Sequence, residues 1–387
     1  MKILGIETSC DETAAAVVEG KDGMIKVLSN VVSSQIEIHK KYGGVVPEVA
    51  AREHVVNILL VISEALERAN LTPTPLKPHP TLSKFGEGRS KSGVRRGLDV
   101  IAVTVGPGLI TSLLVGVETA KTLAYVWQLP VVAVNHIEGH IYANFIKPPY
   151  PPLPARLASQ SEAGRQGGRQ RTIKFPAVIL TVSGGHTMLV LMKGHGKYKI
   201  LGETRDDAAG EAFDKAAQLL GLGYPGGPSV AFQATKIKNQ KSKIKNINLP
   251  RPMIKDKSFD FSFSGLKTAL IYEINRDKNW RKKVAEYCAE FQQAIVDVLT
   301  SKTIRAAKEY KVKTVMLSGG VAANLELRHE LEQKVRQEVK GAKFLMPEIK
   351  YCTDNAAMVA AAGYFRAKQK KFTPWQKLKV DANMELK

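Results

Sequence analysis

The chain has 387 residues, of which 44% are apolar, and this length and composition suggest two domains with substantial cores. No apolar run approaches the roughly 18–20 residues of a membrane span, so no membrane association is expected. Three scattered cysteines, Cys10, Cys288 and Cys352, exclude a disulfide framework and favour a cytoplasmic location.

The net charge of +21 indicates a polyanionic partner, with RNA or DNA as the first candidate. Binding would begin with contacts to phosphates. The alternative is that these charges only solvate surface loops. Essentially all of the excess positive charge lies in residues 73–98, 154–174, 234–258 and 366–379.

Two distant segments share one design, a strand, a polar turn and a second apolar strand. The first has strands at 2–6 and 14–18, and the second has strands at 177–182 and 188–192. Each predicts a hairpin whose tight turn exposes backbone N–H groups. The repeat suggests a duplicated domain with a cleft between the copies; the alternative is two unrelated hairpins.

Helices and one further strand are predicted between and after these hairpins. Apolar residues at three- and four-residue spacing indicate helices over 54–69 and 285–310. A strand over 100–105 ends before Pro107-Gly108, and a helix over 111–125 follows it.

Two histidines four residues apart, His136 and His140, follow an apolar run that ends at Val134. On a helix this spacing places both imidazoles on one face, within reach of one metal ion. Asp354 is the best candidate for a third ligand. Ile137 stands where a HExxH metallopeptidase keeps its glutamate base, which disfavours that activity. The alternative is a pair of histidines on a half-buried helix face.

A glycine turn at Gly319-Gly320 follows a predicted strand over 314–317 and opens a predicted helix over 325–339. Such a turn is suited to an anion or a nucleotide, because unpaired N–H groups and the helix dipole point towards the ligand. The segment matches neither a P-loop nor a dinucleotide-binding turn. The alternative is an ordinary strand-to-helix turn.

Together these motifs resemble the TsaD family of tRNA threonylcarbamoyladenosine transferases, and the motif sequences are most similar to its bacterial branch. The resemblance covers nearly the whole chain, apart from basic insertions around 73–98 and 154–173. It is carried by residues 6–13, 43–48, 106–109, 136–140, 183–187, 206–215, 224–228, 261–268, 319–324 and 351–355.

The resemblance implies an α/β fold of the duplicated actin/hexokinase/Hsp70 type (ASKHA), with two related domains around a nucleotide cleft. The first domain is expected over 1–130, joined by the C-terminal tail at about 372–387, and the second over 131–371. The basic insertion at about 73–98 belongs to the first domain. Basic loops at about 151–173 and 236–249 belong to the second.

The resemblance also implies a reaction. Threonylcarbamoyl-AMP donates its threonylcarbamoyl group to N6 of adenine 37 in tRNAs that read ANN codons, and AMP leaves. The expected partners are tRNA, a shorter paralogous subunit (TsaB-like) and a small ATPase (TsaE-like).

By the same resemblance, His136, His140 and Asp354 hold one divalent transition metal, expected to be Fe(2+) with Zn(2+) as the alternative. Asp11 and Glu12 are expected to deprotonate or position the acceptor amine; a turn-capping role is the alternative. The remaining expected residues bind the donor. They are Thr181, Val182, Ser183, Gly184 and Gly185 for its phosphate and carbamoyl region, Asp214 and Gly227 for the ribose, and Asn324 for the nucleotide.

Two other functions stay open at this point. A kinase of the same superfamily would use Asp11 as its base, but it gives the two histidines and Asp354 no role. A nucleotide-sensing scaffold would need no chemistry at all. Metal content and transfer assays separate these alternatives.

Overall fold

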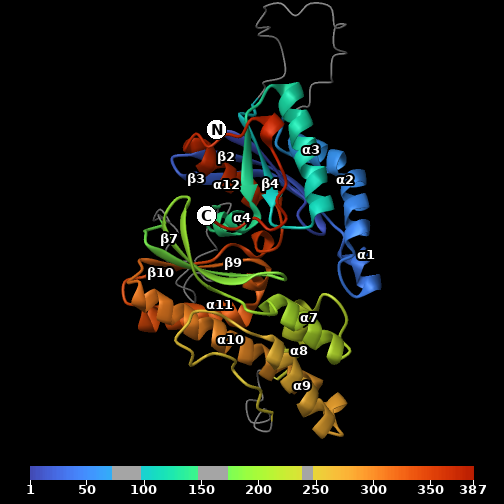
Figure 1. Cartoon of the computed structure of the whole chain (residues 1–387), viewed down its shortest axis with the longest axis vertical. Coiled ribbons are helices and arrows are strands. Elements are labelled where there is room, and N and C mark those ends of the chain that lie inside the picture. The colour runs from blue at the N-terminus through green and yellow to red at the C-terminus, as the bar shows by residue number, and fades with distance from the viewer. Residues whose placement is uncertain (72–96, 147–172, 238–246) are drawn as a thin grey trace, which may run out of the picture. The chain divides into compact units, whose positions relative to one another are not determined.

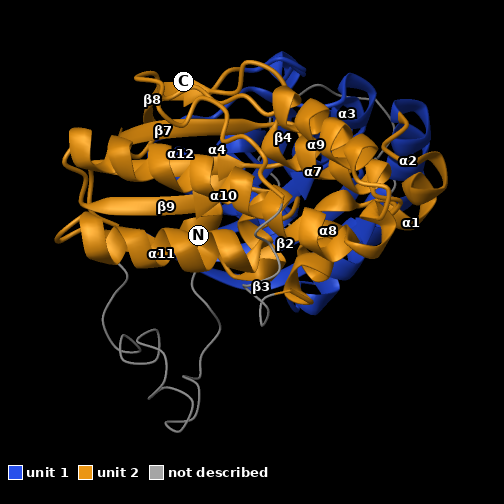
Figure 2. Ribbon diagram, turned by 90° about the horizontal axis from the view of Figure 1, so that it is seen from below, with its two compact units in different colours: residues 1–35, 47–139, 355–384 blue, residues 36–46, 140–354, 385–387 orange. Residues whose placement is uncertain are grey.

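The structure is a computed structural model that describes residues 1–71, 97–146, 173–237 and 247–387 (Figure 1). The predicted basic segments at 73–98 and 151–173 lie almost entirely outside these residues, as do residues 238–246 of the segment at 236–249. The chain forms two compact units (Figure 2). Unit 1 comprises 1–35, 47–139 and 355–384, and unit 2 comprises 36–46, 140–354 and 385–387.

Unit 1 contains a five-stranded mixed sheet with the order β3-β2-β1-β4-β5. β1, β2 and β3 form an antiparallel meander, and β4 and β5 extend the sheet in parallel with β1. The strands are β1 Lys2–Glu7, β2 Glu12–Lys21, β3 Met24–Ser34, β4 Val100–Gly106 and β5 Val131–Asn135.

Helices cover both faces of this sheet because successive strand residues point to opposite sides. On one face, Leu4 and Ile6 of β1 belong to a core shared with α2 (Pro47–Arg68) and α3 (Ile110–Trp127). On the other face, α12 (Ala356–Lys368) crosses β1 at Gly5. A Cβ at Gly5 would lie 2.3 Å from the Ala356 carbonyl oxygen, so only glycine permits this approach.

Unit 2 contains a second five-stranded mixed sheet, with the order β10-β9-β6-β7-β8. β6, β7 and β8 are antiparallel, whereas β9 and β10 run parallel to β6. The strands are β6 Ala177–Val182, β7 Thr187–Gly194, β8 Lys197–Glu203, β9 Thr314–Ser318 and β10 Lys343–Leu345.

One face of this second sheet packs against helices through a large apolar core. Val178 and Leu180 of β6 meet Phe213 of α7 and Phe291 of α10 in that core. The helices of this unit are α7 Ala209–Leu219, α8 Gly226–Thr235, α9 Ser264–Arg276, α10 Val284–Glu309 and α11 Leu325–Glu338.

The remaining helices are short, or join longer elements. They are α1 Ile36–His39, α4 His136–Tyr142, and the 3-10 helices η1 Lys40–Tyr42, η2 Ala143–Phe145, η4 Trp280–Lys282, η5 Gly320–Ala323, η6 Ile349–Tyr351 and η7 Trp375–Lys377. Across the part of the chain that is described, no helix combines the length and the apolar character needed to cross a membrane.

The duplicated α/β fold predicted from the two hairpins is confirmed, because the two sheets repeat one strand order. Read from the antiparallel edge, β3-β2-β1-β4-β5 corresponds to β8-β7-β6-β9-β10. The helices expected over 54–69, 111–125 and 285–310 are present as α2, α3 and α10.

The two compact units divide the chain at different positions from the expected domains. The expected boundaries lay after residues 130 and 371, whereas the units change after residues 139 and 354. The second difference arises because α12 packs on the sheet of unit 1, where Gly363 lies against Ala102 of β4. The boundary lies at 139 rather than 130 because β5 is the edge strand of the sheet of unit 1, so β5 and the start of α4 belong to that unit.

Candidate metal centre and donor site

His136 and His140 occupy the first and second turns of α4, which begins directly after β5. Asn135, the last residue of β5, caps the helix: its Oδ1 accepts hydrogen bonds from the backbone N–H groups of Ile137 and Glu138 at 2.9 and 3.2 Å. The cap satisfies N–H groups that a helix start leaves unpaired. Both imidazoles are buried, with 6% and 1% of His136 and His140 exposed.

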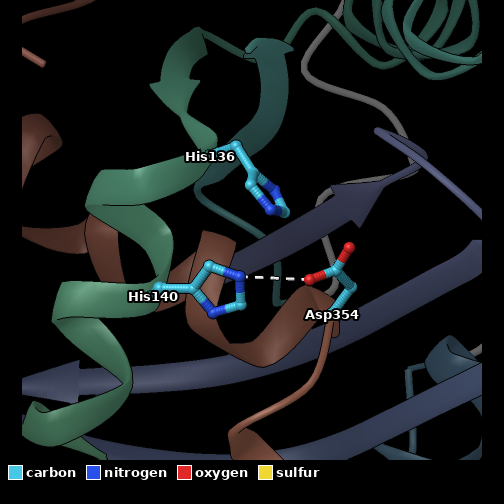
Figure 3. Close-up of side chains that lie close together, drawn as sticks. All are labelled: His136, His140 and Asp354. Carbon is cyan, nitrogen blue, oxygen red and sulfur yellow. Dashed lines mark ion pairs between the residues drawn. The ribbon is translucent and has the colours of Figure 1, made fainter. Parts of the chain in front are cut away.

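Asp354 lies next to both histidines (Figure 3). Nε2 of His140 is 3.1 Å from Oδ1 of Asp354, and one ligand atom from each of the three residues lies within 4.8 Å of the others. Asp354 precedes α12, whose N-cap Asn355 accepts the N–H of Met358 at 3.0 Å and so fixes the turn. Two imidazoles and one carboxylate suit Fe or Zn, and the cluster is consistent with a metal site.

Glu7 and Ser9 contact the ring of His136 at Nδ1. Nδ1 of His136 lies 3.0 Å from Oγ of Ser9 and 3.3 Å from Oε2 of Glu7. Because Nδ1 is engaged there, His136 would coordinate an ion through Nε2. A carboxylate behind a metal-binding histidine fixes its tautomer and raises its basicity as a ligand.

The Glu7 carboxylate is itself fully buried at the end of β1. It accepts hydrogen bonds from the Ser9 N–H and from the Thr104 hydroxyl, each at 2.6 Å. This supporting role was not predicted from the sequence. The available signal was an acidic residue at the end of a continuous apolar strand, where a carboxylate must find donors.

Glu138 ties the same helix to α12. Only 1% of Glu138 is exposed, and its Oε2 lies 2.5 Å from Nε of Arg366. A buried carboxylate of this kind needs a charged or hydrogen-bonding partner. The ion pair thus helps to hold the histidine-bearing helix in place.

The predicted donor turn joins β6 to β7. Ser183 N–H donates to the His186 carbonyl at 2.7 Å, and His186 N–H donates to Oγ of Ser183 at 3.1 Å. These two bonds close the turn and leave Gly184 and Gly185 exposed. Just before the turn, the hydroxyls of Thr181 and Ser318 share a hydrogen bond of 2.9 Å, which joins the ends of the parallel strands β6 and β9.

The glycine turn after β9 lies against the end of β6. Gly319 has a φ of +87°, and a Cβ there would lie 2.3 Å from the Val182 carbonyl oxygen, so glycine is required. Ends of parallel strands in open α/β sheets are common ligand sites. The structure therefore brings the Ser183–Gly185 turn and the Gly319 turn to one edge of the second sheet.

Asp214, Gly227 and Asn324 were all expected to bind the donor, and the two polar side chains also have structural roles. Oδ1 of Asp214 accepts the N–H of Gly226 at 2.7 Å, which joins α7 to the start of α8. Oδ1 of Asn324 caps α11 by accepting the Leu327 N–H at 3.0 Å, and its amide donates to Gln292 at 2.8 Å. A Cβ at Gly227 would meet nothing within 4 Å, so its backbone is approachable.

Asp206 joins two of the segments that carry the family resemblance. Its carboxylate accepts hydrogen bonds from Ser262, Phe263 and Ser264 at the start of α9, at 2.5 to 3.2 Å. Burial alone would raise the pKa of Asp206, but these hydrogen bonds outweigh it and lower the pKa below its ordinary value. Asp206 thus links segment 206–215 directly to segment 261–268.

Asp11 and Glu12 lie in the hairpin turn 8–13, between the paired residues of β1 and β2, and Glu12 is also the first residue of β2, where it pairs with β3. Asp11 is 8% exposed, and its carbonyl accepts the N–H of Gln35 at 3.0 Å. Oε1 of Glu12 accepts a hydrogen bond from Oγ of Ser34 at 3.4 Å. Since Ser9 contacts His136, the turn that carries both acids begins against a predicted metal ligand.

Comparison with known proteins identifies the family. The model of TsaD, tRNA N6-adenosine threonylcarbamoyltransferase, matches residues 26–77, 90–166 and 157–361. The enzyme of that name from Syntrophomonas wolfei is 46% identical over 374 residues, which cover 96% of this chain and 94% of that protein. Those from Bacillus subtilis and Dehalococcoides mccartyi are 47% and 48% identical, covering 94% and 95% of this chain and 90% and 94% of theirs. The chain belongs to the TsaD family.

The predicted transferase function, tRNA N6-threonylcarbamoylation of adenosine, is confirmed by this membership. Among solved structures, T. kodakarensis HypF matches with a TM-score of 0.56 at 12% identity, over 98% of this chain and 49% of HypF. Full-length HypF in its phosphate- and nucleotide-bound form matches with a TM-score of 0.53 at 14% identity, over 95% and 46%. The TsaD-family chain spans about half of these proteins, and the likeness supports the fold alone.

We predict that the TsaD-family chain binds one metal ion at this cluster and that His140→Ala removes most of it, because the variant deletes one of the three expected ligands. Elemental analysis after reconstitution with Fe(II) or Zn(II) measures this. His329→Ala is the control, since His329 is exposed on α11. Full metal occupancy in a His136→Ala/His140→Ala protein would show that the ion binds elsewhere.

Proposed function

We propose that the chain transfers the threonylcarbamoyl group of threonylcarbamoyl-AMP to N6 of adenine 37 in tRNAs that read ANN codons, with release of AMP. The observation that carries this proposal is the clustering of His136, His140 and Asp354 in a chain of this family. Neither a kinase nor a nucleotide-sensing scaffold gives such a cluster a role. The test is in vitro modification of tRNA with threonylcarbamoyl-AMP supplied, with and without partner proteins.

The donor is a mixed anhydride, so no protein nucleophile is needed. N6 of the adenine attacks the carbamoyl carbon, the bond from that carbon to the phosphate oxygen breaks, and N6 loses one proton. The protein has to align donor and base and to stabilise charge on the carbonyl and the leaving phosphate. Asp11 or Glu12 would take the proton or orient the amine. A metal ion at the three ligands would supply Lewis-acid polarisation.

The donor's phosphate and carbamoyl region is assigned to Thr181, Val182, Ser183, Gly184 and Gly185. Support comes from the closed turn, which leaves two glycines exposed, and from the adjoining Gly319 turn. Asp214 and Gly227 would bind the ribose at the start of α8, and Asn324 would contact the nucleotide. The carboxylate and amide groups of Asp214 and Asn324 also fix the local backbone, so they would act from rigid positions.

Iron is the metal we propose, with zinc as the alternative, because both accept two imidazoles and a carboxylate. We also propose that the chain works in the cytoplasm with tRNA, a shorter paralogous subunit and a small ATPase. For the paralogous subunit, α2 offers a surface. Val55, Val56, Leu59 and Leu60 form one face of that helix, and each is 63 to 67% exposed.

The apolar face of α2, defined by these four residues, is unusual because large aliphatic side chains rarely adjoin on a soluble surface. Its opposite face packs in the core of unit 1 through Ile58 and Ile62. A partner that buried the exposed face would remove apolar surface from water. A protein partner with an apolar helix of its own fits this surface.

We predict that Gly184→Val weakens the binding of AMP, because the new side chain occupies the space that a phosphate would approach. A Cβ at Gly184 meets no protein atom within 4 Å, so the fold should be unaffected. Calorimetric titration measures the affinity. Gly265→Val, also in open space but on α9, is the control. Equal AMP affinity in the two variants would argue against the donor turn.

We predict that Val56→Asp/Leu60→Asp abolishes the complex with the paralogous subunit, because a charge on each side chain prevents dehydration of the apolar face. Size-exclusion chromatography of mixed subunits measures this. Tyr272→Asp is the control, since Tyr272 is 61% exposed on α9. Persistence of the complex in the double variant would place the partner elsewhere.

We predict that the basic segment 366–379 contributes to tRNA affinity and not to the chemistry. Its Lys368, Lys370 and Lys371 are exposed at the end of α12. Replacing all three by Gln should reduce the slope of log affinity against log salt by about 0.7–0.9 for each phosphate that is no longer neutralised. Transfer at saturating tRNA should persist.

The matched control replaces Lys193, Lys197 and Lys199, which are exposed on β7 and β8. Both triple variants remove the same charge, so a general electrostatic effect would reduce both salt slopes alike. That result would contradict a specific contribution of segment 366–379 to tRNA affinity.

A further inference from the structure

His54 is a fully buried histidine on α2. Neither the family assignment nor the candidate metal site assigns it a role. It lies on the inner side of the helix with Ala50 and Ile58, whereas its neighbours Val55 and Val56 are exposed. Burying an imidazole is unfavourable unless both nitrogens have partners. The identity of those partners shows what the residue holds.

The ring of His54 bonds to both ends of the Cys10–Thr13 turn. Nε2 lies 2.9 Å from the Cys10 carbonyl oxygen, and Nδ1 lies 2.7 Å from Oγ1 of Thr13. A carbonyl can only accept, so Nε2 carries the hydrogen. In the tautomer with its hydrogen on Nε2, Nδ1 accepts from the Thr13 hydroxyl, so the ring bonds to both ends of a four-residue segment.

Gln35 completes this clamp. Its backbone N–H donates to the Asp11 carbonyl at 3.0 Å, and its side-chain amide donates to the Ala50 carbonyl at 3.3 Å. The same amide lies 3.5 Å from Nδ1 of His54. The backbone of the turn that carries Asp11 and Glu12 is therefore fixed both from α2 and from the end of β3.

We infer that His54 is a positioning residue for transfer: it sets the backbone of the turn that presents Asp11 and Glu12. This inference rests on the proposed role of those two acids. His54 acts through the Cys10 carbonyl and the Thr13 hydroxyl rather than on the reacting atoms themselves. Misplacement of a reacting group by about 1 Å can cost on the order of 100-fold in rate.

The test uses the chain with its partner proteins, threonylcarbamoyl-AMP and tRNA. His54→Leu keeps the volume and removes both hydrogen bonds. We expect kcat to fall by about 10- to 100-fold, with KM for tRNA, metal content and partner binding unchanged. His54→Gln, whose amide can both donate and accept, should restore most of kcat.

Ser29→Ala is the matched control. Ser29 is also buried, and it ties the same helix to the sheet by donating to the Ala65 carbonyl at 2.6 Å, away from the turn. Its removal should lower the melting temperature and leave kcat unchanged. If Ser29→Ala lowers kcat as much as His54→Leu, the role of His54 is only structural and the inference fails.

Thr13→Val covers the case in which His54→Leu does not fold. It deletes the hydroxyl that donates to Nδ1 and preserves shape, and a several-fold fall in kcat with normal metal content is expected. If His54→Leu does not fold, an unchanged kcat in Thr13→Val overturns the inference; if His54→Leu folds, an unchanged kcat in that variant overturns it. If instead Asp11→Asn/Glu12→Gln leaves kcat unchanged while His54→Leu lowers it, the role proposed for the acids fails, and His54 positions the turn for another reason.

Discussion

A buried carboxylate at the end of β1 joins three separate parts of the first unit. Glu7 is completely enclosed, and a charge in that position is tolerated only when hydrogen-bond donors surround it. The donors come from the following turn, from Thr104 of β4 and from the ring of His136 at the start of α4. The hydrogen bonds of this one carboxylate therefore link three separate elements, and they orient the His136 imidazole of the candidate metal centre.

The two units show how one strand order can present two different turns. In each, the first two strands form a hairpin that lies beside parallel strands. The hairpin turn of unit 1 carries Asp11 and Glu12 and is braced by His54. The turn of unit 2 carries Gly184 and Gly185 and closes on itself. The two hairpin turns occupy equivalent positions in the two sheets. Their sequences decide whether a turn presents carboxylates or backbone N–H groups.

The candidate metal site was predicted from the sequence by a local signal and by a family motif. The four-residue spacing of His136 and His140 defines one helix face, and Asp354 came from its motif; the structure brings all three together. The supporting residues Glu7, Thr104 and His54 were missed. Several of their partners lie 41 to 129 positions away in the chain, and no periodicity reports such pairings.

The sequence by itself determined the repeated hairpin, the strands over 100–105 and 314–317, four of the longer helices and the family, because these depend on hydrophobic period, turn residues and contiguous motifs. Only the tertiary structure decided that α12, expected in the second domain, packs on the first sheet. Close packing at Gly5 and Gly363 makes that contact possible, and the Glu138–Arg366 ion pair ties α12 to α4. Likewise, only folding decided which buried polar groups meet. Hydrogen bonds and packing between distant segments depend on three-dimensional proximity, which local patterns along the chain do not encode.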